Sequence, residues 1–363
     1  MTGEFKLWGS ILTPVHIKLL KDVAIVGICL IGVLNCLICR RIYWNVYLLF
    51  FFASVLISLL LSIPAKNVWV LLAGVRNLLP IFLIIFAYRF VDFSLQERIA
   101  KILIALFIIG ISLQIFQLLL PIKIYGLTDF GLSRRNPGFY LIPTSMALFT
   151  FTMMYYVYCF LNPTVFRSLL VFVLGPISAL LTGSGTAYFC LITFFVCLAV
   201  FSRQRKLLAP IFLICGIIGL IFLPQLTSRM DIYVSLTERV AKFGSVLNEN
   251  ILFSEHFGDG TTSACLLAIQ DNAEVGTLFF ADSAFTSTVS SYGLLSLIFL
   301  LLAILYGVKM SKNLLVFSSV FVTFMFTTTL LELFPANMLL SLNLVYYMRN
   351  EPMPHLAGNR LCS

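Results

Sequence analysis

The chain is poor in charged residues, and it lacks the motifs of the common soluble enzyme classes. Only 11% of its 363 residues are charged, whereas soluble domains average about 25%. It contains no GxSxG nucleophile elbow, no Walker loop, no HExxH pair and no dinucleotide-binding glycine fingerprint. Hydrolase, ATPase and zinc-protease functions are therefore without support, and we expect no cofactor.

The nine cysteines do not form the pattern of a disulfide framework or a metal centre. Most of them lie in apolar runs, where cysteine behaves as a small hydrophobic residue. Cys36 and Cys39 fall inside a predicted membrane helix, and Cys265 has no obvious partner in its polar segment. Because no Cys/His spacing is typical of a metal site, we expect no metal.

Apolar sequence, by contrast, is abundant: 60% of the residues are hydrophobic and the mean hydropathy is +1.03. A helix needs about 20 apolar residues to cross a bilayer. The sequence therefore predicts an all-α polytopic integral membrane protein that forms a single membrane domain over residues 1–363. We expect about eleven transmembrane helices, at residues 22–39, 43–63, 68–88, 99–120, 139–161, 165–182, 184–201, 207–224, 285–308, 313–333 and 335–348.

Residues 5–20 are amphipathic and are expected to lie on the membrane surface, and we expect no cleavable signal peptide. The net charge of +9 would point to nucleic acid in a soluble protein. Here the basic short loops, such as Arg40–Arg41 and Arg203–Lys206, instead follow the positive-inside rule and are expected in the cytoplasm. We therefore predict no nucleic-acid partner, and loops 121–138 and 225–284 on the outer side.

One long polar interval, residues 225–284, interrupts the apolar pattern and holds more than half of the carboxylates of the chain. A connection longer than about 15 residues in a compact fold is usually functional or disordered. We predict that this interval is a long extracytoplasmic loop and the extramembrane part of an active site, held by the helices over a membrane-embedded substrate. The alternative is a solvated connector that takes part in no chemistry.

Several arginines lie where the positive-inside rule gives no reason for them. A charge within a membrane helix normally faces the bundle interior and marks a site, and the planar arginine fork matches phosphate oxygens. The sequence thus predicts a site for a lipid-linked phosphate or pyrophosphate, lined by Arg76, Arg134, Arg135, Arg229 and Arg239.

Each of these arginines also has a purely structural interpretation. Arg134 and Arg135 would contact lipid headgroups and Arg229 would extend from a helix end to the interface. Arg76 would pair with a carboxylate such as Glu332, and Arg239 would form an ion pair within a helix.

A transfer reaction onto a hydroxyl needs a general base within hydrogen-bonding reach. The candidates in the polar interval are His256, Asp259 and Asp282. Imidazole titrates near neutrality, which makes His256 suitable, although glycine-rich acidic stretches such as EHFGDGTT are also common turns. Asp282 precedes a predicted helix, so the alternative is a capping role there with Ser283 nearby.

Three parts of the chain carry a resemblance to a known family. LLTGSGTAYFCL at 180–191 is similar to an LTGSRT stretch that begins a span after a tight outer turn. NPGFYLIPTSMALF at 136–149 is similar to the helix start after the first outer loop. HFGDGTT at 256–262 and ADSAFTSTVSSYGLLSLIFL at 281–300 match the end of a long loop and the helix after it. Together they resemble bacterial O-antigen polymerases of the Wzy type, within the group that includes O-antigen ligases.

The resemblance implies a glycosyltransferase with an architecture similar to glycosyltransferase family C, working at the periplasmic face of the bacterial inner membrane. The donor would be the growing glycan on undecaprenyl pyrophosphate, and the acceptor a new repeat unit on the same lipid carrier. A chain-length regulator would be a further partner. Arginines would stabilise the pyrophosphate as leaving group, while a carboxylate or histidine of the long loop would deprotonate the acceptor hydroxyl, without metal or nucleotide sugar.

Two positions depart from the pattern of the family. Gly185 stands where the family often has arginine, so Arg76 or the pair Arg134 and Arg135 is expected to compensate. Asp282 stands where ligases carry histidine, which favours a polymerase over a ligase that uses lipid A core as acceptor. A transporter or flippase of an anionic solute is the alternative from another class, and it would carry charges in several spans and paired broken helices.

Overall fold

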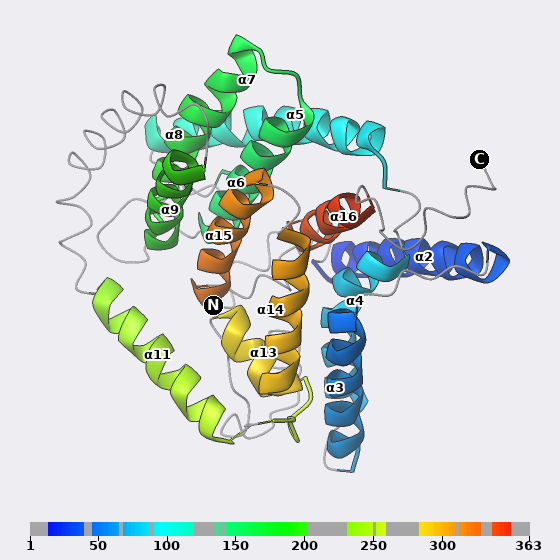
Figure 1. Cartoon of the computed structure of the whole chain (residues 1–363). Helices are drawn as coiled ribbons and strands as arrows, with labels where there is room; N and C mark the ends of the chain where they lie inside the picture. The colour runs from blue at the N-terminus through cyan, green and yellow to red at the C-terminus, as the bar shows by residue number, and fades with distance from the viewer. Residues whose placement is uncertain are drawn as a thin grey trace.

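A computed structural model of the chain describes residues 14–39, 46–64, 68–86, 91–119, 136, 138–139, 143–201, 231–249, 252–258, 283–308, 312–327 and 336–349. Every regular element among these residues is a helix, and they contain no strand (Figure 1). The predicted all-helical fold is confirmed for this part of the chain.

The first described helices coincide with long apolar runs of the sequence. They are α2 (Pro14–Cys39), α3 (Val46–Ser62), α4 (Val68–Phe86) and α5 (Phe93–Leu119). Asp92 begins α5, because its Oδ1 accepts a hydrogen bond from the backbone N–H of Leu95 at 2.7 Å, as expected of an N-cap. Pro80 lies inside α4, where it cannot donate a hydrogen bond to the preceding turn.

The middle of the chain forms α6 (Pro143–Phe160), α7 (Val165–Leu169), η1 (Leu170–Leu174), α8 (Gly175–Leu181) and α9 (Gly185–Phe201). The predicted span 165–182 thus exists as α7, η1 and α8 in continuous succession, with a π-helical turn in its centre. Thr164 caps its start by accepting a hydrogen bond from the backbone N–H of Arg167. Pro176, which has no backbone N–H to donate, sits just after the π turn.

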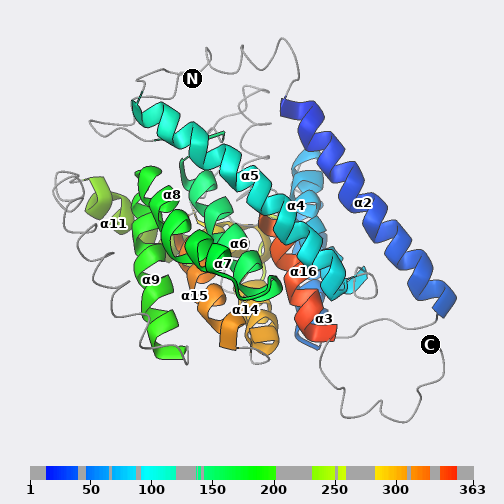
Figure 2. The ribbon, with the colours of Figure 1, turned by 90° about the horizontal axis from the view of Figure 1, so that it is seen from above.

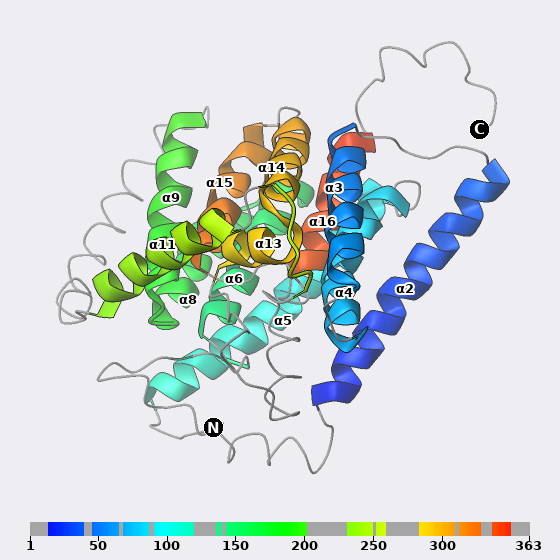
Figure 3. The same cartoon turned by 90° about the horizontal axis from the view of Figure 1, so that it is seen from below.

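The last part of the chain forms α11 (Asp231–Glu249), α13 (Ala284–Tyr292), α14 (Leu294–Val308), α15 (Lys312–Thr327) and α16 (Ala336–Arg349). Helix α11 lies along one side of the bundle, and α2 lies at the opposite edge, beside α4 (Figures 1, 2 and 3). Helices α13 and α14 lie between them.

Three sequence predictions need correction. The first described helix begins at Pro14 rather than at 22, because proline fits the first turn of a helix. The end of the predicted amphipathic segment, residues 14–20, therefore belongs to the same helix. The predicted span 285–308 is two helices, α13 and α14, separated at Gly293, whose φ is 86°. The polar interval 225–284 is not only a loop, because α11 occupies part of it. The predicted span 207–224 lies outside the described residues.

Of the described helices, α5 is the one that is long and apolar enough to cross a membrane. Shorter apolar helices accompany it, among them α3, α9 and α14.

Two hydrophobic cores share the bundle. The first core is centred on α6, α9 and α15, where the Phe151 ring lies 5.7 Å from the Phe324 ring and 6.3 Å from the Phe194 ring, all three rings being buried. The second core joins α2, α3, α4, α14 and α16 around the buried rings of Phe51, Phe257 and Tyr292. Helix α13 contributes to both, with Phe285 and Val289 in the first and Tyr292 in the second.

Candidate functional site

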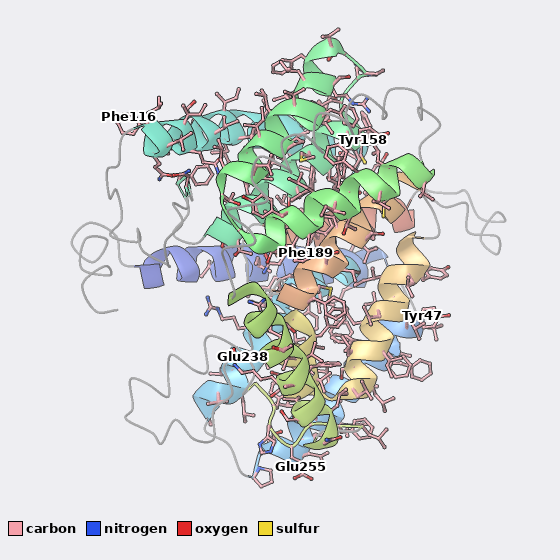
Figure 4. All side chains as sticks on the ribbon, turned by 90° about the vertical axis from the view of Figure 1, so that its left-hand side faces the viewer. Tyr47, Phe116, Tyr158, Phe189, Glu238 and Glu255 are labelled. Carbon is pink, nitrogen blue, oxygen red and sulfur yellow. The ribbon has the colours of Figure 1, made fainter. Side chains whose placement is uncertain are left out.

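A short segment of the polar interval enters the second core. This segment, residues 252–258, is called the hook below. Ser254, Phe257 and Gly258 are buried, whereas Glu255 and His256 are exposed. The hook therefore presents its acid and its histidine on the surface while its other side is held inside the protein; Figure 4 shows Glu255 at the outer edge of the bundle.

Two serines of α3 hold the hook. Ser58 and Ser62 are four residues apart, which puts them on one face of the helix, and both are fully buried. The Ser58 hydroxyl accepts a hydrogen bond from the backbone N–H of Ser254 at 3.0 Å and donates to the carbonyl of Tyr292 at 2.9 Å. The Ser62 hydroxyl accepts from the backbone N–H of Phe257 at 2.9 Å and donates to the carbonyl of Ser58 at 2.8 Å.

Ser254 extends these contacts to the histidine. Its hydroxyl donates to the carbonyl of Ser290 in α13 and accepts a hydrogen bond from the backbone N–H of His256 at 2.9 Å. The backbone N–H groups of Ser254, His256 and Phe257 are thus all bound to serine hydroxyls. The backbone on either side of the exposed His256 side chain is therefore fixed.

The Phe257 ring fills a space that exists because α4 carries glycine at position 74. A Cβ atom at Gly74 would lie 2.5 Å from Cε1 of Phe257. The Tyr292 ring packs 5.3 Å from the Phe257 ring, and the Tyr292 hydroxyl donates to the carbonyl of Gly74 at 2.8 Å. Gly258 has a φ of 86°, and a Cβ atom there would collide with the carbonyl oxygen of Val70. The hook therefore fits α4 only with glycine at both positions.

The other end of the hook meets the break between α13 and α14. The backbone N–H of Leu295 donates to the carbonyl of Leu252 at 3.3 Å. A Cβ atom at Gly293 would collide with the same carbonyl. The break in the predicted single span thus makes room for the hook.

Helix α13 is short, rich in hydroxyl groups and buried along its whole length. Ser283 caps it, since its hydroxyl accepts a hydrogen bond from the backbone N–H of Thr286 at 3.1 Å. The alternative role of Asp282 as the helix cap is therefore filled by Ser283. Asp282 and Asp259 themselves lie outside the described residues.

Helix α11 is amphipathic and packs against α13. Phe243, Val246 and Leu247 of its apolar face contact the first core, and Arg239 continues the same face one turn earlier, by the i, i+4 and i, i+7 spacing. The Nε atom of Arg239 is buried, and among the described residues it has no hydrogen-bond partner. No described carboxylate pairs with Arg239, so the helical ion pair that was the alternative is not seen; its neighbour Glu238 is exposed (Figure 4).

Arg76 and Asn77 of α4 occupy different faces. Arg76 is half-buried and lies roughly 160° around the helix from Gly74, the residue that contacts the hook. By this spacing the Cα–Cβ bond of Arg76 points away from the face of α4 that contacts the hook. Asn77 lies one turn from Gly74 on the hook side; it is 7% exposed, and its Nδ2 has no hydrogen-bond partner among the described residues. Sequence reasoning missed Asn77, although an amide inside an apolar span was a signal for it.

Of the predicted site residues, Arg76, Arg239 and His256 are described, and Arg134, Arg135 and Arg229 lie outside the described residues. The elements that carry the three described residues are α4, α11 and the hook. All three contact α13 or its end: α4 through Tyr292, the hook through Ser290 and α11 by packing. In the part of the chain that the structure describes, no three His, Cys, Asp or Glu side chains gather as metal ligands would.

A second polar segment is anchored on α5, directly after Arg134 and Arg135 in the sequence. Gln114 Nε2 donates to the carbonyl of Asn136 at 3.0 Å. Gln117 exchanges two hydrogen bonds with the backbone of Gly138, at 2.8 and 2.9 Å. The described start of the 136–149 stretch is thus held by two glutamines of one helix face.

Comparison with known proteins identifies no relative of this chain: no family model, no curated protein and no solved structure matches it.

Proposed function

We propose that this chain is an O-antigen polymerase, a glycosyltransferase of the bacterial inner membrane with about eleven spans and an architecture similar to glycosyltransferase family C. It joins oligosaccharide repeat units carried on undecaprenyl pyrophosphate into polysaccharide at the periplasmic face. The sequence resemblance supplies the reaction class, and the arrangement around α13 supports the assignment of roles to individual residues.

Exposed apolar surface supports the multi-pass membrane location. Large exposed apolar side chains recur along one face of a helix, for example Ile102, Leu106 and Ile109 on α5 at 60%, 41% and 55% exposed. Isolated exposed apolar residues are ordinary in soluble proteins, but contiguous apolar patches are not. Lipid tails would cover this surface.

The environment of the Arg239 side chain is the main observation in support of the proposal. A guanidinium whose buried Nε has no hydrogen-bond partner among the described residues is costly unless an anion meets it. It lies on the bundle-facing side of a helix that packs against the hydroxyl-rich α13. A diphosphate at this position would satisfy the Nε, and the positive charge would stabilise the leaving group.

The reaction then runs in one displacement. His256 accepts the proton of the acceptor hydroxyl, whose oxygen forms the new bond to the anomeric carbon of the donor glycan. The bond from that carbon to the pyrophosphate oxygen breaks, and undecaprenyl pyrophosphate leaves against Arg239. Asp259 and Asp282 are further candidates for the base, and Arg76, Arg134, Arg135 and Arg229 for contacts with the two lipid pyrophosphates.

The test is a lipopolysaccharide gel from a host that lacks its own polymerase and carries this gene. A ladder of many repeat lengths is expected from the wild type, and its loss from Arg239→Ala at unchanged protein level. Lys242→Ala is the matched control, because Lys242 lies on the same helix but is exposed, and it should retain the ladder. A full ladder from Arg239→Ala would refute the pyrophosphate role, and no ladder from the wild type would refute polymerisation of that repeat unit.

A further inference from the structure

The hook is held by directed hydrogen bonds to its backbone in addition to the packing of the Phe257 ring. We infer that Ser58 and Ser62 of α3 are positioning residues, whose hydroxyls fix the hook backbone so that His256 is presented in one place. This inference rests on the proposed role of His256 as the base. It adds two residues of a membrane helix to the machinery of the polar interval.

Each serine hydroxyl is oriented from both sides. The Ser58 hydroxyl donates its hydrogen bond to the carbonyl of Tyr292, and the Ser62 hydroxyl donates to the carbonyl of Ser58. Their lone pairs are thereby left for the backbone N–H groups of Ser254 and Phe257. A hydroxyl has one proton and two acceptor sites, so this arrangement uses the serines as fixed acceptors.

The two anchor points enclose the histidine. Between the bound N–H groups of Ser254 and Phe257 there are only two residues, Glu255 and His256, and both are exposed. The N–H of His256 is itself bound to the Ser254 hydroxyl. The side chain can change rotamer, but its Cα cannot move far while both serines hold. Small displacements of a reacting group are costly to rate, which gives the anchoring a catalytic consequence.

Ser54 provides a matched control on the same stripe of α3. It is buried and lies one turn before Ser58, but its hydroxyl bonds to the carbonyl of Phe51 and the hydroxyl of Ser296, both at 2.8 Å. In Ser54→Ala, Ser296 still donates to the carbonyl of Tyr292 at 2.6 Å. In Ser62→Ala, by contrast, the buried N–H of Phe257 loses its acceptor. The two variants remove the same atom, and only one of them releases the hook.

The first measurement is hydrogen exchange of the purified full-length protein in lipid nanodiscs, followed on peptides that cover residues 252–258. Ser58→Ala and Ser62→Ala should each speed exchange of this segment about tenfold, since a buried donor without an acceptor favours local opening. Ser54→Ala should exchange like the wild type. If residues 252–258 stay as protected in both Ser58→Ala and Ser62→Ala as in the wild type, the inference is wrong, whatever the activity of the protein is.

The second measurement is the lipopolysaccharide ladder at matched protein level. Ser62→Ala should reduce polymer about tenfold, Ser62→Thr should recover much of it because the hydroxyl is retained, and Ser54→Ala should leave it unchanged. Faster exchange with a full ladder would overturn the positioning role. If the wild type itself makes no ladder, the proposed function fails and the positioning role fails with it, while the exchange data still decide whether the serines hold the hook.

Discussion

The two cores of the molecule differ in how they use polar groups. The first core is dominated by aromatic and methionine side chains of α6, α9 and α15, and its rings meet edge to face. The second core is crossed by the row Ser54, Ser58 and Ser62, and a segment of the polar interval enters it. The first core also contains buried polar groups, since Ser178 bonds to Gln114, which holds the backbone of Asn136. The difference is that the hook enters among the side chains of the second core, which acts as its receptacle.

This difference shows which interactions fix the position of a backbone segment in an apolar bundle. Dispersion and ring packing fill space in either core, but they do not hold a backbone segment in one register. Directed hydrogen bonds do, and a hydroxyl buried away from water is retained only where it has a partner. The buried serines of α3 thus hold in one register the segment that carries the proposed base.

The largest expected effect is on the first core. Phe151→Ala removes a fully buried ring that packs against Phe194 and Phe324, and it should destabilise the protein by about 3–5 kcal/mol. Polymer should fall only in proportion to the amount of folded protein, measured by detergent unfolding and by immunoblot. Phe116→Ala is the control, because Phe116 is 43% exposed on α5 (Figure 4). A specific loss of polymer per folded molecule would show that this core does more than support the fold.

The next effect separates stability from activity in the second core. Gly258→Ala forces a side chain into a positive φ and against the carbonyl of Val70, a local strain of about 1–3 kcal/mol. The hook should leave α4 and take the buried Phe257 ring out of the second core, so the thermal midpoint should fall somewhat, while polymer should be lost far beyond any loss of folded protein. Gly244→Ala, at a helical glycine with open space around its Cβ position, should be neutral. A variant at Gly258 that keeps both fold and polymer would show that the hook is not needed.

Much of the fold could be predicted from the sequence because apolar runs and their interruptions mark helices directly. The helices α3, α4, α6 and α9 match the predicted spans within a few residues. The break at Gly293 could not be predicted, because it depends on the approach of Leu252, a tertiary contact. From the sequence, helix α11 was predicted only as a helical alternative for Arg239 and not as an element of the bundle, because its polar composition masked the apolar spacing of Phe243, Val246 and Leu247.

The site could be predicted only in part, for a physical reason. Charged residues stand out in an apolar chain, so Arg76, Arg239 and His256 became candidates, but charge alone does not tell which face of a helix they occupy. By helical spacing Arg76 lies away from Gly74, the α4 residue that contacts the hook, whereas Asn77 lies nearer to it. The serines of α3 were missed because small hydroxyl residues also serve neutral packing in membrane helices.

The smallest expected effect completes the comparison, because it concerns a hydroxyl in the first core. Thr150 is fully buried, and its Oγ1 lies 3.2 Å from the hydroxyl of Ser178. In Thr150→Val the shape is nearly kept, and Ser178 still donates to Oε1 of Gln114 at 2.7 Å, so no group is left without a partner. The stability loss should stay near 1 kcal/mol, and the ladder should be complete. Since Ser62→Ala also removes a single buried hydroxyl, the pair isolates what the hydroxyl holds. If Thr150→Val also abolished polymer at normal protein level, the first core would share the positioning role and the distinction between the two cores would fail.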